Sequence, residues 1–299
     1  MKYHTPVLLQ KVLEFLDPRP GKTFIDATVG GGGHTLEILK RDAKVLGIDR
    51  DPEAIKHLKK EVHSSQFTAC LPARQVHSLE LVQGNFANIG EIAMSKSFTN
   101  VDGILFDLGV SSHQLKTADR GFSFEKSGPL DMRMDPNLTV RAYDLVNNFD
   151  QRRLNEIFKT YGQEELSWPI TGAICRARQI KPIESTVELA AIIKEVYWRK
   201  RKKSKLHPAT KVFQALRIVV NSELLNLEET LPQTTDLLKI GGRLAIISFH
   251  SLEDGIVKRF FKQQERLRVL TPKPIGPTYL EIEKNPCARS AKLRVAEKI

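Results

Sequence analysis

Hydrophobic positions along this chain follow two different periods. Short apolar runs of the kind found in buried strands are separated by stretches whose apolar residues recur three and four positions apart, as in amphipathic helices. The strand-like runs lie at Lys22–Ala27, Lys44–Ile48, Val101–Leu108 and Arg243–Phe249. Helical patterns follow the first two runs, at His34–Arg41 and Asp51–Val62. Strands that alternate with helices predict an α/β fold, a doubly wound parallel sheet with helices on both faces.

The chain between the last two predicted strands is much longer than one crossover requires. Helical patterns dominate its middle part, at Gln151–Tyr161, Pro169–Ala177 and Thr186–Trp198. We therefore predict an inserted helical subdomain over residues 111–206, within a main domain formed by residues 1–110 and 207–299. A long amphipathic helix, Ala209–Leu227, is expected to lead back to the sheet, and the alternation at Ala291–Ala296 predicts an antiparallel closing strand.

Composition narrows the class of protein. The 299 residues are 41% hydrophobic, and no apolar run has the roughly eighteen residues of a membrane span. The start of the chain lacks the pattern of a signal or transit peptide, so we expect a soluble, cytoplasmic protein. Its three cysteines, Cys70, Cys175 and Cys287, are far apart, which favours reduced thiols over disulfides or a paired metal site.

The chain is basic, with a formal net charge of +11, which suits a nucleic-acid partner. Its most basic stretch is Trp198–Lys205, beside His207. We predict RNA phosphate contacts there, made by Arg199, Lys200, Arg201, Lys202 and Lys203, although a solvated loop explains the same composition. Near the end of the chain, Arg289, Lys292 and Arg294 are expected to extend this basic face.

A cofactor site is indicated where the first two predicted strands end. The tract Gly30–Gly33 follows the first strand, and glycine lets a backbone approach a ligand closely. Asp49 closes the second strand, where it can accept hydrogen bonds from ribose hydroxyls. The alternatives are a tight turn for the glycines and a helix cap for Asp49.

Two adenosine cofactors fit this arrangement, NAD and S-adenosylmethionine. The glycine tract lacks the third glycine of the dinucleotide fingerprint. Asp26 and Asp107, at the ends of two strands, suit a cationic sulfonium or amine better than a pyrophosphate, although Asp26 alone is also explained as a turn cap.

Many ordered sequence blocks resemble one family, the ribosomal RNA small subunit methyltransferase H family, bacterial enzymes that modify N4 of a cytidine in small-subunit ribosomal RNA. The blocks are HTPVLL (His4–Leu9), DATVGGGGHT (Asp26–Thr35), GIDRDPEAI (Gly47–Ile55), GNFANI (Gly84–Ile89), DGILFDLGVSSHQL (Asp102–Leu115), RGFSF and GPLDMRMD (within Arg120–Asp135), TYGQEE (Thr160–Glu165), HPATKVFQALRIVVNSEL (His207–Leu224), GGRLAIISFHSLED (Gly241–Asp254) and NPCARSAKLR (Asn285–Arg294). One departure is His113, where family members often have proline.

The resemblance implies an S-adenosylmethionine-dependent methyltransferase fold and function. It implies a target cytidine near the decoding centre, and as partner the ribosomal RNA or the small ribosomal subunit. It also implies a set of cofactor-binding residues: Gly32, Gly33, His34, Asp49, Phe86, Asp107 and Gln114. Phe86 is suited to covering an adenine face, and core packing is its alternative role.

Methyl transfer to a cytosine amine requires orientation of a weak nucleophile and an acceptor for its hydrogen bonds. Asp107 is our catalytic candidate, with Ser111 and Ser112 as weaker helpers. The Asp or Asn followed by Pro-Pro-aromatic, found in many amino-group methyltransferases, is replaced here by Asp107–Val110. We interpret His34 and His250 as structural partners rather than bases, and no metal is implied.

Two alternatives remain from the sequence. One is an NAD-dependent oxidoreductase, which the incomplete glycine fingerprint disfavours. The other is a non-catalytic RNA-binding or ribosome-assembly protein that retains a nucleoside pocket. The sequence predicts no oligomeric state.

Overall fold

The computed structural model describes residues 6–63, 78–204 and 206–299. The chain divides into two compact units. The first comprises Met1–Ser111 with Leu224–Ile299, and the second comprises Ser112–Glu223. Every helix in the described ranges is too short or too polar to cross a lipid bilayer.

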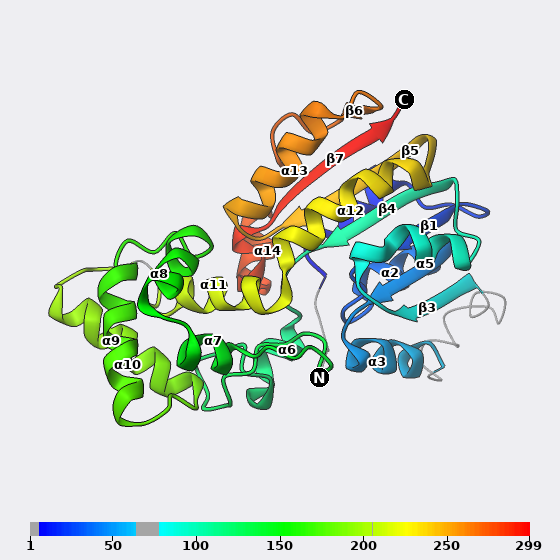
Figure 1. Ribbon diagram of the computed structural model, residues 1–299. Coiled ribbons are helices and arrows are strands. Elements are labelled where there is room, and N and C mark those ends of the chain that lie inside the picture. The colour runs from blue at the N-terminus through cyan, green and yellow to red at the C-terminus, as the bar shows by residue number, and fades with distance from the viewer. Residues whose placement is uncertain (1–5, 64–77, 205) are drawn as a thin grey trace. The chain divides into compact units, whose positions relative to one another are not determined.

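One sheet organises the first unit, and seven strands of the described chain form it (Figure 1). They are β1 (Thr23–Asp26), β2 (Lys44–Asp49), β3 (Leu79–Gln83), β4 (Val101–Asp107), β5 (Leu238–Ser248), β6 (Leu267–Val269) and β7 (Lys292–Lys298). The order across the sheet is β3-β2-β1-β4-β5-β7-β6. The first five strands run parallel, and β7 runs antiparallel to both β5 and β6. The predicted doubly wound sheet and its antiparallel closing strand are confirmed.

The helices of this unit cover both faces of the sheet. They are α1 (Leu9–Leu16), α2 (Gly33–Leu39), α3 (Pro52–Val62), α5 (Ile89–Ser95), α12 (Glu223–Leu237), α13 (Ser251–Gln263) and α14 (Tyr279–Lys284), with short turns η2 (Phe86–Asn88) and η4 (Pro286–Ser290). The side chains of a strand alternate between the two faces of the sheet, so each strand contributes residues to two hydrophobic cores. Phe24 and Leu105 pack on the side of α1 and α2, whereas Ile25 and Ile104 pack on the side of α5 and α12.

The second unit is helical. It contains α6 (Ser112–Lys116), η3 (Ala118–Arg120), α7 (Ala142–Asn148), α8 (Gln151–Thr160), α9 (Ser167–Ile180), α10 (Thr186–Arg199) and α11 (Thr210–Asn221). Contacts link α9 to both α8 and α10, and α11 to α7 and α8. Apolar residues at three- and four-residue spacing, such as Leu154 and Phe158 on α8, are buried between these helices.

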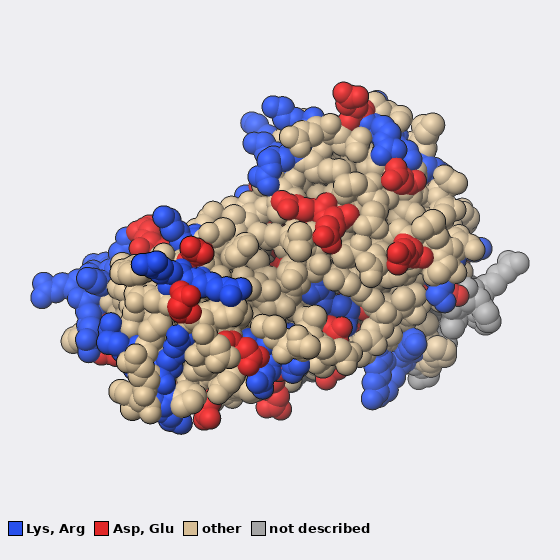
Figure 2. All heavy atoms as spheres, viewed as in Figure 1, with Lys and Arg blue, Asp and Glu red and all other residues tan. Residues whose placement is uncertain are grey.

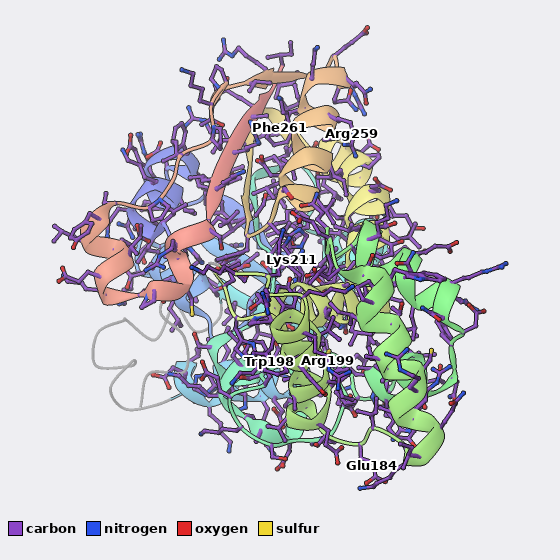
Figure 3. The ribbon with its side chains drawn as sticks, turned by 90° about the vertical axis from the view of Figure 1, so that its left-hand side faces the viewer. Glu184, Trp198, Arg199, Lys211, Arg259 and Phe261 are labelled. Atoms are coloured by element: carbon purple, nitrogen blue, oxygen red, sulfur yellow. The ribbon has the colours of Figure 1, made fainter. Side chains whose placement is uncertain are left out.

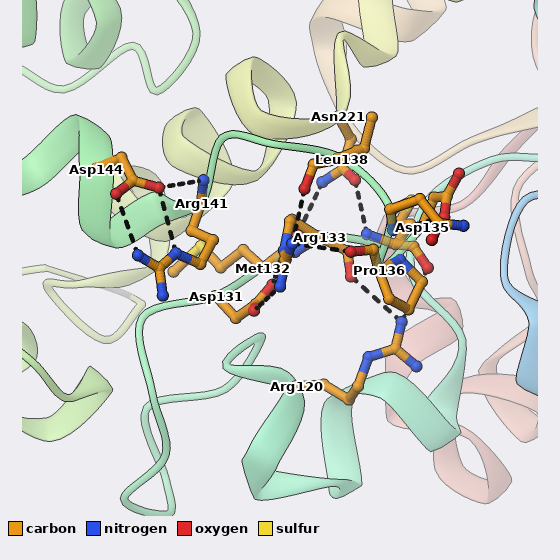
Figure 4. Close-up of polar contacts among 12 residues, drawn as sticks. Arg120, Asp131, Met132, Arg133, Asp135, Pro136, Leu138, Arg141, Asp144 and Asn221 are labelled. Carbon is orange, nitrogen blue, oxygen red and sulfur yellow. Dashed lines mark hydrogen bonds and ion pairs between the residues drawn. The ribbon is translucent and has the colours of Figure 1, made fainter.

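The prediction of a single helix over Ala209–Leu227 is wrong. Ser222 adopts a left-handed conformation, with φ of 50°, and separates α11 from α12. The side chain of Asn221 stabilises this break, because its amide donates to the Met132 carbonyl at 2.7 Å and its oxygen accepts from the Met134 N–H at 2.8 Å (Figure 4). Helix α11 therefore belongs to the helical unit, and the chain returns to the first unit at Leu224 instead of residue 207.

Charged side chains hold the long connection before α7 (Figure 4). Arg133 forms two hydrogen bonds with the Asp131 carboxylate, of 2.8 and 2.7 Å. Arg120 donates to the carbonyls of Arg133 and Met134 at 3.2 and 2.9 Å. These bonds satisfy carbonyls that no helix or strand pairs, and they order the segment that contains GPLDMRMD.

Candidate active site

The glycine tract forms the turn between β1 and α2. Gly30 and Gly32 have positive φ angles of 51° and 77°, a region in which glycine is strain-free. A Cβ on Gly32 would lie 2.5 Å from a Leu58 methyl carbon, and one on Gly33 would lie 2.8 Å from the Pro6 ring. The fold itself therefore requires glycine at both positions, independently of any ligand.

Asp49 organises this turn from the end of β2. Its carboxylate accepts the Gly30 N–H at 2.7 Å on one oxygen and the Asp51 N–H at 2.9 Å on the other. Burial raises the pKa of Asp49 to about 6, although the two N–H groups act in the opposite direction. The cap of α3 is Asp51, which accepts the Glu53 N–H, so Asp49 is not the helix cap. Each Asp49 oxygen has a second lone pair with which it can accept a further hydrogen bond.

Asp26 has a structural role in the same turn. Its two oxygens accept from the Thr28 N–H at 3.2 Å and from the Thr35 hydroxyl at 2.6 Å. Burial is the main reason that the pKa of Asp26 is raised. This arrangement matches the turn-cap interpretation of Asp26, because its carboxylate ties the end of β1 to the start of α2.

Asp107 lies at the carboxyl end of β4, next to β1 in the sheet. Its N–H donates to the Thr28 hydroxyl at 2.6 Å, and one carboxylate oxygen lies 3.5 Å from Nδ1 of His34. The other nitrogen of His34, Nε2, lies 3.0 Å from the Val7 carbonyl, which can only accept, so Nε2 carries a proton. The contact with Val7 orients the ring so that Nδ1 faces the Asp107 carboxylate. His34 is therefore a positioning partner of Asp107.

Phe86 follows β3 and is only partly buried. Its ring packs edge-on against Phe106, with centroids 5.6 Å apart, and the Arg50 guanidinium lies 5.6 Å from its centre. The Phe86 carbonyl accepts from the Thr230 hydroxyl, and the Gly84 N–H donates to the Asp49 carbonyl. Phe86 thus has both a packing role and a fixed place beside the end of β2.

The structure brings most of the predicted cofactor residues into the first unit, at the carboxyl edge of β1, β2 and β4. Ser111 is the last residue of that unit's first segment, whereas Ser112 and Gln114 lie on α6 of the second unit. The cofactor and catalytic roles of all these residues stay predictions. Sequence reasoning assigned no role to Thr28, Thr35 or the Val7 carbonyl, because hydrogen bonds between distant segments leave no local pattern.

The predicted RNA-binding residues are exposed at the end of α10. Arg199 pairs with Glu195 at 2.5 Å and Lys202 with Glu165 at 2.6 Å. Lys200, Arg201 and Lys203 have no acidic partner among the described residues. Lys205 lies outside the described residues. Figure 2 shows Lys and Arg side chains standing out over the helical unit.

The structure corrects one residue of the predicted C-terminal basic face, Arg294. Arg294 is buried, and it holds Asp254 with two hydrogen bonds of 2.6 and 3.3 Å. Lys292 pairs with the same carboxylate at 3.3 Å. Because Arg294 is buried against Asp254, it cannot contact RNA phosphates. The side chain of Lys292 is partly exposed and Arg289 is exposed, so their part in a basic face stays a prediction. The interpretation of His250 as structural fits its place as the cap of α13, where its Nδ1 accepts the Glu253 N–H.

The expectation of free thiols is confirmed for two of the three cysteines. Cys175 is partly buried and Cys287 is exposed, and both are free thiols. Cys70 lies outside the described residues.

Comparisons with known proteins identify relatives over the full length. The model of the MraW methylase family matches residues 1–299. A protein of Thermomicrobium roseum named ribosomal RNA small subunit methyltransferase H is 45% identical, covering 99% of this chain and 94% of its own. A protein of the same name from Persephonella marina is 45% identical over the whole of both chains. Among solved structures, an rRNA methylase of Streptococcus thermophilus matches 97% of this chain at 13% identity, with a TM-score of 0.45.

Proposed function

Because the chain belongs to the MraW methylase family, we propose that it transfers a methyl group from S-adenosylmethionine to N4 of a cytidine in small-subunit ribosomal RNA. That it is a methyltransferase follows from the family. The observation that best supports the cofactor is the paired carboxylates at one sheet edge, Asp49 after β2 and Asp107 after β4.

The residues present fit S-adenosylmethionine chemically. Asp49 holds the glycine turn and can still accept from two ribose hydroxyls. Phe86 is only partly buried and offers an aromatic surface for an adenine. The turn lacks the third glycine of the dinucleotide fingerprint, and the Asp107 carboxylate at the same sheet edge suits a cationic sulfonium or amine better than a pyrophosphate, which favours S-adenosylmethionine over NAD.

When bound, S-adenosylmethionine supplies an electrophilic methyl group on a sulfonium. The residues of this chain orient the acceptor and hold protons. The lone pair of the cytosine amine is delocalised into the ring, so the site must align the amine and accept its N–H hydrogen bond as it changes shape. Asp107 performs this step in our proposal, with His34 fixing its carboxylate. Ser111 and Ser112 are secondary candidates for contacts with the base.

The RNA substrate is proposed from the relatives' names and from charge. The relatives are named for the small ribosomal subunit RNA. The exposed cations at the end of α10 supply phosphate contacts that do not read sequence. We further propose that the target cytidine lies near the decoding centre, and that the substrate is either the RNA itself or the assembled small subunit. A base in structured RNA must leave its stack to reach the methyl donor.

The test is to incubate the protein with methyl-labelled S-adenosylmethionine and small ribosomal subunits that lack the modification. Digestion of the RNA and mass spectrometry then identify the labelled nucleoside, and we expect N4-methylcytidine. Label in another nucleoside would redirect the substrate assignment. Cofactor binding without any label, alongside an active control enzyme, would favour a non-catalytic RNA-binding role. Binding of NAD instead of S-adenosylmethionine would favour the oxidoreductase alternative.

A further inference from the structure

The end of α10 exposes a large aromatic side chain close in sequence to Lys200, Arg201 and Lys203, which have no acidic partner among the described residues. Trp198 is 78% exposed to solvent, and Figure 3 shows it next to Arg199 on the last turn of the helix. Tryptophan is rarely left so open on a soluble protein, because its ring buries a large apolar area in any contact. This exposure singles out Trp198 as a contact residue.

The backbone that carries Trp198 is firmly held. Tyr197, the preceding residue, is buried, and its hydroxyl lies within 2.9 Å of both oxygens of the buried Glu164 carboxylate. Glu164 also accepts the Leu166 N–H at 2.9 Å, which fixes it to the start of α9. Lys202 pairs with Glu165 on the same connection. The backbone that carries the ring is therefore ordered before any ligand packs on it, which lowers the entropy cost of binding.

The end of the helix is closed by a defined motif. The Arg201 N–H donates to the Trp198 carbonyl and the Lys202 N–H donates to the Tyr197 carbonyl, both at 3.0 Å. These bonds form a Schellman motif, whose left-handed position is usually glycine. Here it is Arg201, with φ of 51°. An arginine at a position that favours glycine places a cation beside Trp198 at a cost in stability.

We infer that Trp198 is a stacking platform for an unpaired nucleobase of the RNA, with Lys200, Arg201 and Lys203 binding the phosphates that flank that base. Aromatic rings combined with cations form the usual surface for single-stranded nucleic acid. The inference rests on the proposed RNA substrate, and it adds to it a specific base contact outside the methyl-transfer site.

Fluorescence can test this contact directly, because the chain has only two tryptophans. In the Trp168→Phe protein, all indole emission comes from Trp198. Single-stranded RNA of roughly eight nucleotides should quench that emission, whereas an abasic oligomer of equal length and charge should not. In the Trp198→Phe protein the remaining Trp168, which is 53% exposed, should not respond to the RNA. Equal quenching by both oligomers would show a charge effect and overturn the inference.

Affinity gives a second readout. Trp198→Ala should raise the Kd for RNA roughly tenfold, as expected for one lost stacked base, and leave S-adenosylmethionine affinity unchanged. Trp198→Phe should retain most of the affinity, and Trp168→Ala is the matched control that should change neither. Unchanged RNA affinity in Trp198→Ala, while methylation continues, would refute the platform and leave the proposed function intact. If the wild-type protein proves to be a dimer that Trp198→Ala dissociates, and RNA does not quench Trp198, the inference is overturned and the ring is assigned to self-association.

If the wild-type protein methylates no RNA, the proposed function fails, and the fluorescence experiment still reports whether Trp198 stacks on bases.

Discussion

At the scale of single residues, Asp49 links cofactor binding to pH. Its pKa is raised to about 6 mainly by burial. Ribose hydroxyls donate hydrogen bonds and therefore favour the carboxylate form. Affinity for S-adenosylmethionine should be highest above about pH 7, where Asp49 is ionised. It should fall as the pH decreases through 6, and at about pH 5 it should be roughly tenfold below that highest value. Calorimetric titration across this range measures the effect.

Asp49→Asn provides the control for that prediction. The amide keeps an oxygen acceptor but cannot ionise, so binding should be weaker at neutral pH and should lose its dependence on pH near 6. A wild-type pH profile retained in this variant would assign the titration to another group.

Asp107 carries the prediction for the chemical step. Asp107→Asn removes the negative charge and the proton acceptor and retains the shape of the side chain. Turnover at saturating S-adenosylmethionine should fall by about 10²-fold or more. Single-turnover methylation of small subunits measures this rate, and the thermal transition checks that the variant is folded. Full turnover with normal cofactor binding would remove Asp107 from the chemistry.

At the scale of elements, replacing Arg201 at the end of α10 by glycine should raise stability and weaken RNA binding. Arg201→Gly relieves the left-handed strain and should raise the free energy of unfolding by about 0.5–1 kcal/mol. It should also weaken RNA binding, because one cation is lost. Arg201→Ala loses the same cation but keeps the unfavourable conformation. It should therefore weaken RNA binding equally without a gain in stability. Denaturant unfolding and RNA titration measure the two effects, and equal stability of both variants would contradict the strain argument.

The strands that end at an acidic residue or before a glycine tract were predictable from sequence, because buried parallel strands form continuous apolar runs. β1, β2 and β4 lie within one or two residues of their predicted bounds. The break at Ser222 was not predictable, because an unbroken amphipathic pattern crosses it and Asn221 pairs with residues far away in sequence. For the same reason, Arg294 was predicted on the surface although Asp254 holds it inside.

In the candidate site, too, the features with a local sequence pattern were predictable, and the contacts between distant segments were not. The glycine turn and Asp49 are recognisable because each sits at the end of a strand. The contacts of Thr28 and His34 with Asp107 depend on how β1, α2 and β4 meet, and no spacing in the sequence reveals this. Gln114 was assigned by resemblance and Ser112 as a weak helper in the chemistry, and both belong to the helical unit.

At the scale of the whole molecule, the net charge of +11 raises the question whether RNA affinity is general or local. If the end of α10 makes phosphate contacts, replacing Lys200, Arg201 and Lys203 by serine should lower RNA affinity. It should also reduce the slope of log affinity against log salt by about 2, since each phosphate contact to a single strand contributes roughly 0.7. A matched variant replaces Lys56, Lys59 and Lys60, three exposed lysines of α3, and removes the same charge. We expect a much smaller change in slope for this variant. Equal changes in the two variants would mean that net charge, rather than the end of α10, governs RNA binding.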